Sequence, residues 1–189
     1  MVPPGVVVVS GLPATGKSTL ARTLAKELGL VHIWKDDMRK ALWPVLSVLP
    51  SRTLTTVPRA MSDLVCTVLA SVLDAGHGGV VDANFNIPEQ AEPIRDLLDE
   101  RGVPCFEVCL WADPVVLRKR FIERADPPLT PDMEDYLERA LHRERRSVLR
   151  PPTPIVEFES TEFGALDASH GQLIERISRA LGLPNSAGS

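Results

Sequence analysis

The sequence predicts an α/β protein in three layers, with a five-stranded parallel sheet covered by helices on both faces. Short apolar runs alternate with longer amphipathic segments, which is typical of parallel strands joined by helices. The first run holds four consecutive valines, Val6–Val9, as expected for a strand buried on both faces. The 189 residues fit a single domain over residues 1–183, followed by a flexible tail at 184–189.

Each short run rich in β-branched and aromatic residues predicts a strand. The expected strands are Val6–Ser10, Val31–Trp34, Val80–Ala83, Phe106–Trp111 and Ile155–Phe158. The amphipathic segments between and after them predict helices at Lys17–Leu28, Asp37–Trp43, Arg59–Ala75, Glu89–Arg101, Pro114–Arg124, Asp132–Leu149 and Gln172–Leu181.

Glycines and prolines mark the ends of these elements. Glycines 29, 76, 102 and 182 stand where helices should stop, because glycine readily adopts the left-handed conformation of a C-terminal cap. Prolines interrupt Leu46–Pro58, which predicts an irregular segment near a ligand, and Ala125–Pro131, which predicts a mobile loop between two helices.

Composition excludes several classes of function. The formal net charge of −4 and the 5% aromatic content disfavour a surface that binds nucleic acid. Cysteines 66, 105 and 109 and the four histidines show no metal-ligand spacing, which indicates reduced thiols and no zinc site. No signal peptide or membrane span is expected, so the sequence predicts a cytoplasmic protein.

A phosphate-binding motif follows the first strand. Gly11–Ser18 matches G-x-x-x-x-G-K-[ST] in full, between the expected strand and helix that such a loop requires. Lys17, expected to be exposed, would reach the β- and γ-phosphates, and Ser18 would offer its hydroxyl to Mg²⁺. The expected nucleotide-binding residues in this P-loop are Gly11, Pro13, Ala14, Thr15, Gly16, Lys17, Ser18 and Thr19.

Two further strand ends narrow the class of nucleotide protein. Asp82 is followed by Ala83 rather than the glutamate of a hydrolytic motor, and no Asn-Lys-x-Asp motif of a GTPase occurs. Asp36 and Asp37 end the second apolar run, at the sheet edge that also carries the P-loop. Either carboxylate could accept the proton of an attacking hydroxyl, and either could instead cap the following helix.

With these motifs the chain resembles P-loop kinases of the AAA_33-like group, which includes polynucleotide 5′-kinases, chloramphenicol phosphotransferase, zeta-type toxins and small metabolite kinases. In "KDDMR", the resemblance implies that Asp36 is the general base and that Arg39 binds the acceptor. In "VVDANFN", it implies acceptor-side or magnesium-side roles for Asp82 and Asn84. Either Asp37 or Asp82 could assist Ser18 at the Mg²⁺ through water.

The same resemblance places a lid at about residues 118–131. Arg120 and Arg124 occupy the lid-arginine positions, which implies that they bind nucleotide and, for Arg124, that it is catalytic. Cationic donors suit the charge that spreads over a transferring phosphoryl group, and a closing lid excludes water. Seven acidic residues are interleaved with the basic ones over residues 118–150, so most of these charges are expected to form a solvated helix face.

The sequence therefore predicts a phosphotransferase that uses Mg²⁺ and ATP or GTP and acts on a hydroxyl of a small molecule: a metabolite, a nucleoside or an antibiotic. The acceptor is expected between Asp36, Arg39 and the apolar residues Trp43, Leu46, Val48 and Leu49, which could equally be core packing. A polynucleotide 5′-hydroxyl kinase and a nucleotide-sensing regulatory ATPase are the alternatives. The residues do not distinguish ATP from GTP and do not indicate an oligomeric state.

Overall fold

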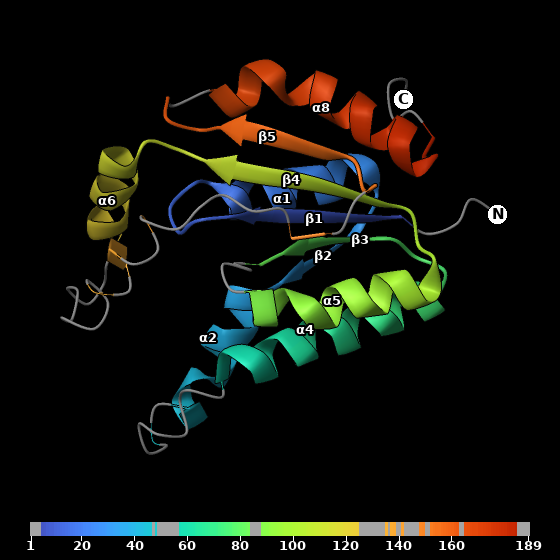
Figure 1. Cartoon of the computed structure of the whole chain (residues 1–189), viewed down its shortest axis with the longest axis horizontal. Helices are drawn as coiled ribbons and strands as arrows, with labels where there is room; N and C mark the ends of the chain where they lie inside the picture. Colours follow the sequence, from blue (N-terminus) through green and yellow to red (C-terminus); the bar gives the residue numbers. More distant parts are fainter. Residues whose placement is uncertain are drawn as a thin grey trace.

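The protein contains one parallel sheet of five strands. The computed structural model describes residues 5–46, 48, 57–83, 88–124, 135, 137–138, 141, 148–149, 152–162 and 165–184. The strands are β1 (Val6–Gly11), β2 (Val31–Trp34), β3 (Gly79–Asp82), β4 (Cys105–Trp111) and β5 (Ile155–Glu159). They are arranged in the order β2-β3-β1-β4-β5, and every neighbouring pair is parallel (Figure 1).

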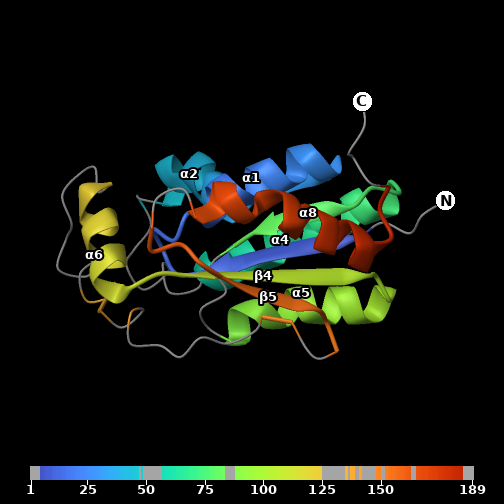
Figure 2. The same cartoon turned by 90° about the horizontal axis from the view of Figure 1, so that it is seen from above.

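Helices cover both faces of this sheet. The described helices are α1 (Lys17–Leu28), α2 (Lys35–Leu46), α4 (Val57–Asp74), α5 (Pro88–Arg101), α6 (Pro114–Glu123) and α8 (Ala165–Leu181). Helices α1 and α8 lie on one face and α4 and α5 on the other, while α6 stands beyond the edge where the strands end (Figures 1 and 2). The predicted three-layer α/β fold is confirmed.

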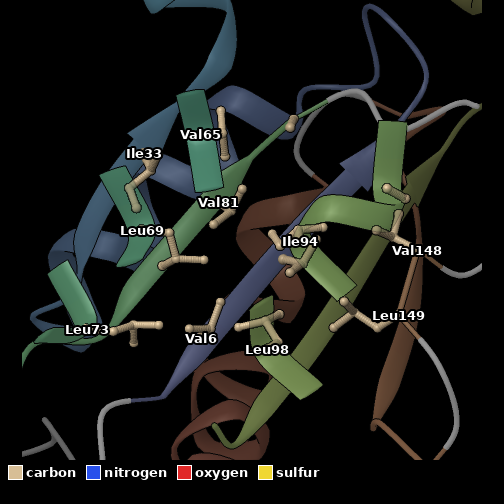
Figure 3. Packing of buried hydrophobic residues seen from close by; sticks show 13 residues of the cluster. Val6, Ile33, Val65, Leu69, Leu73, Val81, Ile94, Leu98, Val148 and Leu149 are labelled. Carbon is tan, nitrogen blue, oxygen red and sulfur yellow. The ribbon is translucent and has the colours of Figure 1, made fainter. Parts of the chain in front are cut away.

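The valines of β1 join the two layers of the core. Val6 and Val8 pack with residues of α4 and α5 (Figure 3 labels Val6 in this cluster), whereas Val7 and Val9 pack with residues of α1 and α8. All four are fully buried, and full burial of one such side chain contributes roughly 1.5–3 kcal/mol. The central strand that leads into the P-loop is therefore held firmly from both faces.

The predicted glycine caps are confirmed. Glycines 29, 76, 102 and 182 all have φ between 57° and 79°, the left-handed region that glycine enters without steric cost. Two helices differ from expectation. Helix α2 begins at Lys35 directly after β2 and includes Pro44 near its end, where proline has no N–H to donate to the helix. Helix α8 begins at Ala165 rather than Gln172.

Several expected features lie outside the described residues. These are the loop at 125–131, all but isolated positions of the expected helix at 132–149, most of the segment at 46–58 and the tail at 185–189. Cysteines 66, 105 and 109 are thiols rather than disulfides, as expected. None of the described helices combines the length and the apolar character needed to cross a membrane.

Candidate active site

The P-loop connects the end of β1 to the start of α1. Gly11 and Gly16 have φ of 144° and 87°, and Ala14 is the non-glycine residue with positive φ in the described part of the chain. A Cβ on Gly11 would lie 2.4 Å from the carbonyl oxygen of Leu110, so glycine is required there by space as well as by φ. The tightly wrapped loop leads directly into the N-terminus of α1. A helix N-terminus attracts phosphate groups.

Lys17 is buried within this loop, with 7% of its surface exposed. The expectation of an exposed lysine is therefore wrong. It is the first residue of α1, and its ammonium lies close enough to Asp82 to oppose the rise in the pKa of that carboxyl group. A lysine held in this way contributes a fixed positive charge rather than a mobile one.

Asp82 ends β3 beside β1, where it pairs in register with Val9. The side chain is 1% exposed, and neither carboxylate oxygen has a hydrogen-bond partner among the described residues. Burial raises its pKa, while the nearby hydroxyl of Ser18, the ammonium of Lys17 and His32 oppose that shift. The Ser18 hydroxyl is thus near Asp82 without making a well-formed hydrogen bond, and His32 Nε2 lies 3.9 Å from Asp82 Oδ2.

These residues fit a magnesium ion. A buried carboxylate without a donor, next to a hydroxyl at the first turn of a helix, supplies the oxygen ligands that Mg²⁺ prefers. The described part of the chain holds no group of three or more His, Cys, Asp or Glu suited to a metal. In nucleotide sites Mg²⁺ is commonly held by one or two protein groups together with the phosphates of the nucleotide.

The residues that the sequence predicts on the acceptor side lie in the first turns of α2. Asp36 and Arg39 are about half exposed, with 4.0 Å between Asp36 Oδ1 and Arg39 Nε. Asp36 is close enough to Asp82 for its charge to help raise the pKa of that carboxyl group. Hence the structure brings Lys17, Ser18, Asp36 and Asp82 to one edge of the sheet. Asp37, also in the first turn, is exposed.

Trp43 and Val48 do not belong to the core, since 51% and 78% of their surfaces are exposed. The core-packing alternative for these two residues is therefore wrong. Leu46 is half-buried, and Leu49 and Asn84 lie outside the described residues.

Sequence reasoning missed Lys35, which precedes Asp36. Its ammonium is buried and donates to the Ser62 hydroxyl of α4 at 3.1 Å. Burial lowers the pKa of Lys35. The contact fixes the start of α2, and with it Asp36, against α4. A lysine between an apolar strand and two aspartates was the available signal.

The two arginines that the sequence predicts in a lid lie on α6 and at its C-cap. Arg120 donates to the carbonyl oxygens of Ser160 and Thr161, and Arg124 is exposed at the C-cap of α6. On the outer surface of α6, Arg118 pairs with Glu138 and Lys119 lies 3.9 Å from Glu123. These exposed pairs agree with the solvated face that the interleaved charges predict.

A cavity of about 270 Å³ lies away from these residues, where β4 begins. It is lined by residues of α5, by Val103–Cys105 and by Pro152–Pro154, and it contains none of the predicted site residues.

Comparison with known proteins places this geometry in a family. The family model AAA_33, described as an AAA domain, matches residues 6–152. An adenylate kinase from Mycobacterium ulcerans is 30% identical over 185 residues, covering 93% of this chain and 96% of the relative.

Two solved structures share the fold. A protein described as a kinase from Chloroflexus aurantiacus superposes with a TM-score of 0.76 at 21% identity, covering 96% of this chain and 98% of the other. A gluconokinase from Sinorhizobium meliloti superposes with a TM-score of 0.56 at 15% identity, covering 96% of this chain and 94% of the other. Together with the complete P-loop and the parallel sheet, the family match shows that the chain belongs to the AAA_33 family of P-loop kinases.

Proposed function

We propose that this protein transfers the γ-phosphoryl group of ATP or GTP to a hydroxyl group of a small molecule. The observation that carries the proposal is the position of Asp36. It is a half-exposed carboxylate at the start of α2, near the buried side chains of Lys17 and Asp82. A carboxylate that remains accessible next to a phosphate site suits a group that must accept a proton from a substrate.

The donor nucleotide would lie with its phosphates on the P-loop. Backbone N–H groups of Gly16–Ser18, where α1 begins, would bind the phosphate oxygens. Lys17 would bridge the β- and γ-phosphates from its buried position. Ser18 and Asp82 would hold Mg²⁺, which when bound neutralises charge on the phosphates.

The acceptor hydroxyl would approach from the α2 side. Asp36 accepts the hydroxyl proton as the acceptor oxygen forms its bond to the γ-phosphorus. The bond from that phosphorus to the bridging oxygen breaks, and the nucleoside diphosphate leaves. Arg39, one turn along α2, would bind the acceptor, with Asp82 and Asn84 on the same side.

The lid would close over this arrangement. Arg124 would move toward the phosphates, where its charge stabilises the transferring group, while Arg120 would hold residues 160–161 beside the P-loop. Exclusion of water at this stage protects the phosphoryl group from hydrolysis. The gluconokinase shares the fold of this chain, and that likeness does not itself identify the acceptor.

A phosphate acceptor is the second candidate, because the relative from Mycobacterium ulcerans is named an adenylate kinase. A phosphate oxygen of a nucleoside monophosphate is already ionised near neutral pH and needs no general base. A hydroxyl does need one. The two candidates therefore differ in what they require of Asp36.

The test compares Asp36→Asn with Asp37→Asn, a neighbouring carboxylate in the same first turn of α2. For a hydroxyl acceptor, Asp36→Asn should lower the transfer rate by roughly 10²–10⁴-fold. Affinity for the magnesium nucleotide should hardly change, because the P-loop residues are intact. Full activity of Asp36→Asn with loss in Asp37→Asn would identify Asp37 as the base. Full activity in both variants would contradict the hydroxyl-acceptor proposal.

A further inference from the structure

The segment that follows β5 contacts the P-loop directly. Ser160 is 4% exposed, and its hydroxyl donates to the carbonyl oxygen of Thr15 at 2.7 Å. A longer contact of 3.1 Å joins the same hydroxyl to the carbonyl oxygen of Trp111, which also accepts the Ser160 amide at 2.8 Å. Because a hydroxyl has one hydrogen, the shorter contact indicates that this hydrogen serves Thr15.

The same segment is bound to helix α6 at two points. Arg120 donates to the carbonyl oxygens of Ser160 and Thr161 at 2.7 and 2.9 Å. At the other end of the helix, the amide of Asp113, the N-cap of α6, donates to the Thr161 hydroxyl at 2.9 Å. Residues 160–161 therefore lie between α6 and the P-loop and contact both (Figure 1 shows α6 beside the end of β5).

The Ser160 contact controls the direction of a peptide group in the P-loop. A trans peptide is planar, so the N–H of Gly16 points opposite to the carbonyl of Thr15. With that carbonyl fixed on Ser160, the Gly16 N–H faces away from Ser160. Thr15 is fully buried, so without the serine hydroxyl its carbonyl would lose a partner that water could not easily replace.

We propose that Ser160 is a positioning residue that orients the P-loop for phosphate, and that Arg120, by holding Ser160, ties helix α6 to that orientation. Arg120 then acts on the nucleotide through residues 160–161. The position of helix α6 and the conformation of the P-loop therefore depend on each other. The inference rests on the P-loop as a nucleotide site and not on the chemistry of the acceptor.

The first experiment uses the full chain without nucleotide. Hydrogen exchange should be followed at the amides of Thr15, Thr19 and Leu20, which donate to the carbonyls of Leu12 and Gly16. In Ser160→Ala and in Arg120→Ala, these amides should exchange at least about threefold faster, because the loop opens more often. Unchanged exchange in both variants, with the proteins still folded by thermal melting, would overturn the proposal.

The second experiment is a double-mutant cycle on MgADP affinity, measured by titration calorimetry. Ser160→Ala should weaken binding by about 3–10-fold, the span of one hydrogen bond. Since the two residues act along one chain of contacts, the double variant with Arg120→Ala should bind within about twofold of the weaker single variant. If the fold-losses of MgADP affinity in the two single variants instead multiply in the double variant, Arg120 contacts the nucleotide independently of Ser160. That result would overturn the coupling.

Ser178→Ala is the matched control. Ser178 is a second buried serine, 1% exposed, on α8, and its hydroxyl has no hydrogen-bond partner among the described residues. It should leave exchange at the P-loop and MgADP affinity at wild-type values. A loss of affinity as large as that of Ser160→Ala would overturn the specific role of Ser160. All these measurements omit the acceptor, so a chain that shows the coupling but transfers no phosphoryl group would contradict the proposed function alone.

Discussion

At the scale of single residues, the buried carboxylate of Asp82 is a feature that costs stability in the metal-free protein. Its carboxylate is almost fully buried, and neither oxygen has a hydrogen-bond partner in the described structure. Burial is the largest cause acting on its pKa and raises it, which means that the folded chain opposes the charged form. A group of this kind is retained when a bound cation offsets its cost.

Replacing Asp82 by Asn should therefore stabilise the metal-free protein while removing its activity. The variant removes the buried charge and keeps the side-chain volume. Thermal unfolding without Mg²⁺ should move upward by a few degrees, corresponding to on the order of 1 kcal/mol. Phosphoryl transfer should fall steeply in the same protein. A lower unfolding temperature together with normal transfer would contradict the magnesium-site assignment.

The cysteines give a residue-scale prediction that depends on pH. Burial raises the pKa of Cys66 to about 11 and that of Cys105, which lines the cavity at the start of β4, to about 12. The thiolate is the reactive form, so a raised pKa makes the thiolate scarce at neutral pH. Below the pKa, the thiolate population rises about tenfold for each unit by which the pH is raised.

Iodoacetamide labelling at pH 7, 8 and 9, mapped by peptide mass spectrometry, tests this expectation. At pH 8, Cys66 should react roughly 100-fold and Cys105 roughly 1,000-fold more slowly in the native chain than in the denatured chain, whose thiols have ordinary pKa values. The native rate should rise with pH. Native labelling as fast as in the denatured chain, or independent of pH, would contradict the assigned burial.

At the scale of elements, Glu107 joins β4 to distant parts of the chain. Its carboxylate accepts the Ser10 hydroxyl from β1 at 3.0 Å. It also accepts the amides of Val148 and Leu149, at distances between 2.8 and 3.0 Å. The side chain is fully buried, so these donors satisfy a charge that would otherwise be costly. Residues 148–149 are thereby fixed beneath the strand that leads into the P-loop.

Glu107→Gln should destabilise the fold. The amide nitrogen of glutamine would place a donor against donors and leave at least one backbone N–H without its acceptor. We expect a loss of about 2–3 kcal/mol, which corresponds to roughly 5–10 °C in unfolding temperature for a chain of this size. Glu175→Gln, at an exposed position of α8, is the control and should change little. Equal unfolding temperatures for both variants would contradict the role of Glu107.

Elements could be predicted from sequence where the signal is local. The valines of β1, the spacing of Gly11–Ser18 and the glycines after the helices each act within a few residues. Contacts between distant residues had no such signal. Glu107 and Val148 are separated by 41 positions and Ser160 and Thr15 by 145, and only the folded sheet brings them together.

In the candidate site, too, features set by the local sequence could be predicted and features set by tertiary packing could not. The closeness of Asp36 to Asp82 could be expected because the carboxyl ends of parallel strands share one edge of the sheet, while the proposed roles of Arg39 and Asp82 come from the family resemblance. The burial of Lys17 was missed, because exposure depends on how the loop packs against β3 and not on the motif. The Arg120 contacts depend on where α6 stands, which its own sequence does not specify.

For the whole molecule, one edge of the sheet brings together a phosphate cradle, a buried carboxylate and an accessible carboxylate on a separate helix. The opposite edge carries a cavity without these groups. α/β proteins that bind ligands at the carboxyl ends of their strands show the same difference between the two edges of the sheet. It supports the view that donor and acceptor meet between the P-loop and α2.

The most direct test of that view is a transfer assay with γ-labelled ATP and GTP against two sets of acceptors, hydroxyl compounds and nucleoside monophosphates. The hydroxyl set contains sugars, nucleosides, antibiotics and oligonucleotides with a free 5′-hydroxyl. The bond formed is identified by ³¹P NMR. We expect the label in a phosphate monoester on a small-molecule hydroxyl, lost in Asp36→Asn. Label found only in a phosphoanhydride of a nucleoside diphosphate, or only in inorganic phosphate, would contradict the account.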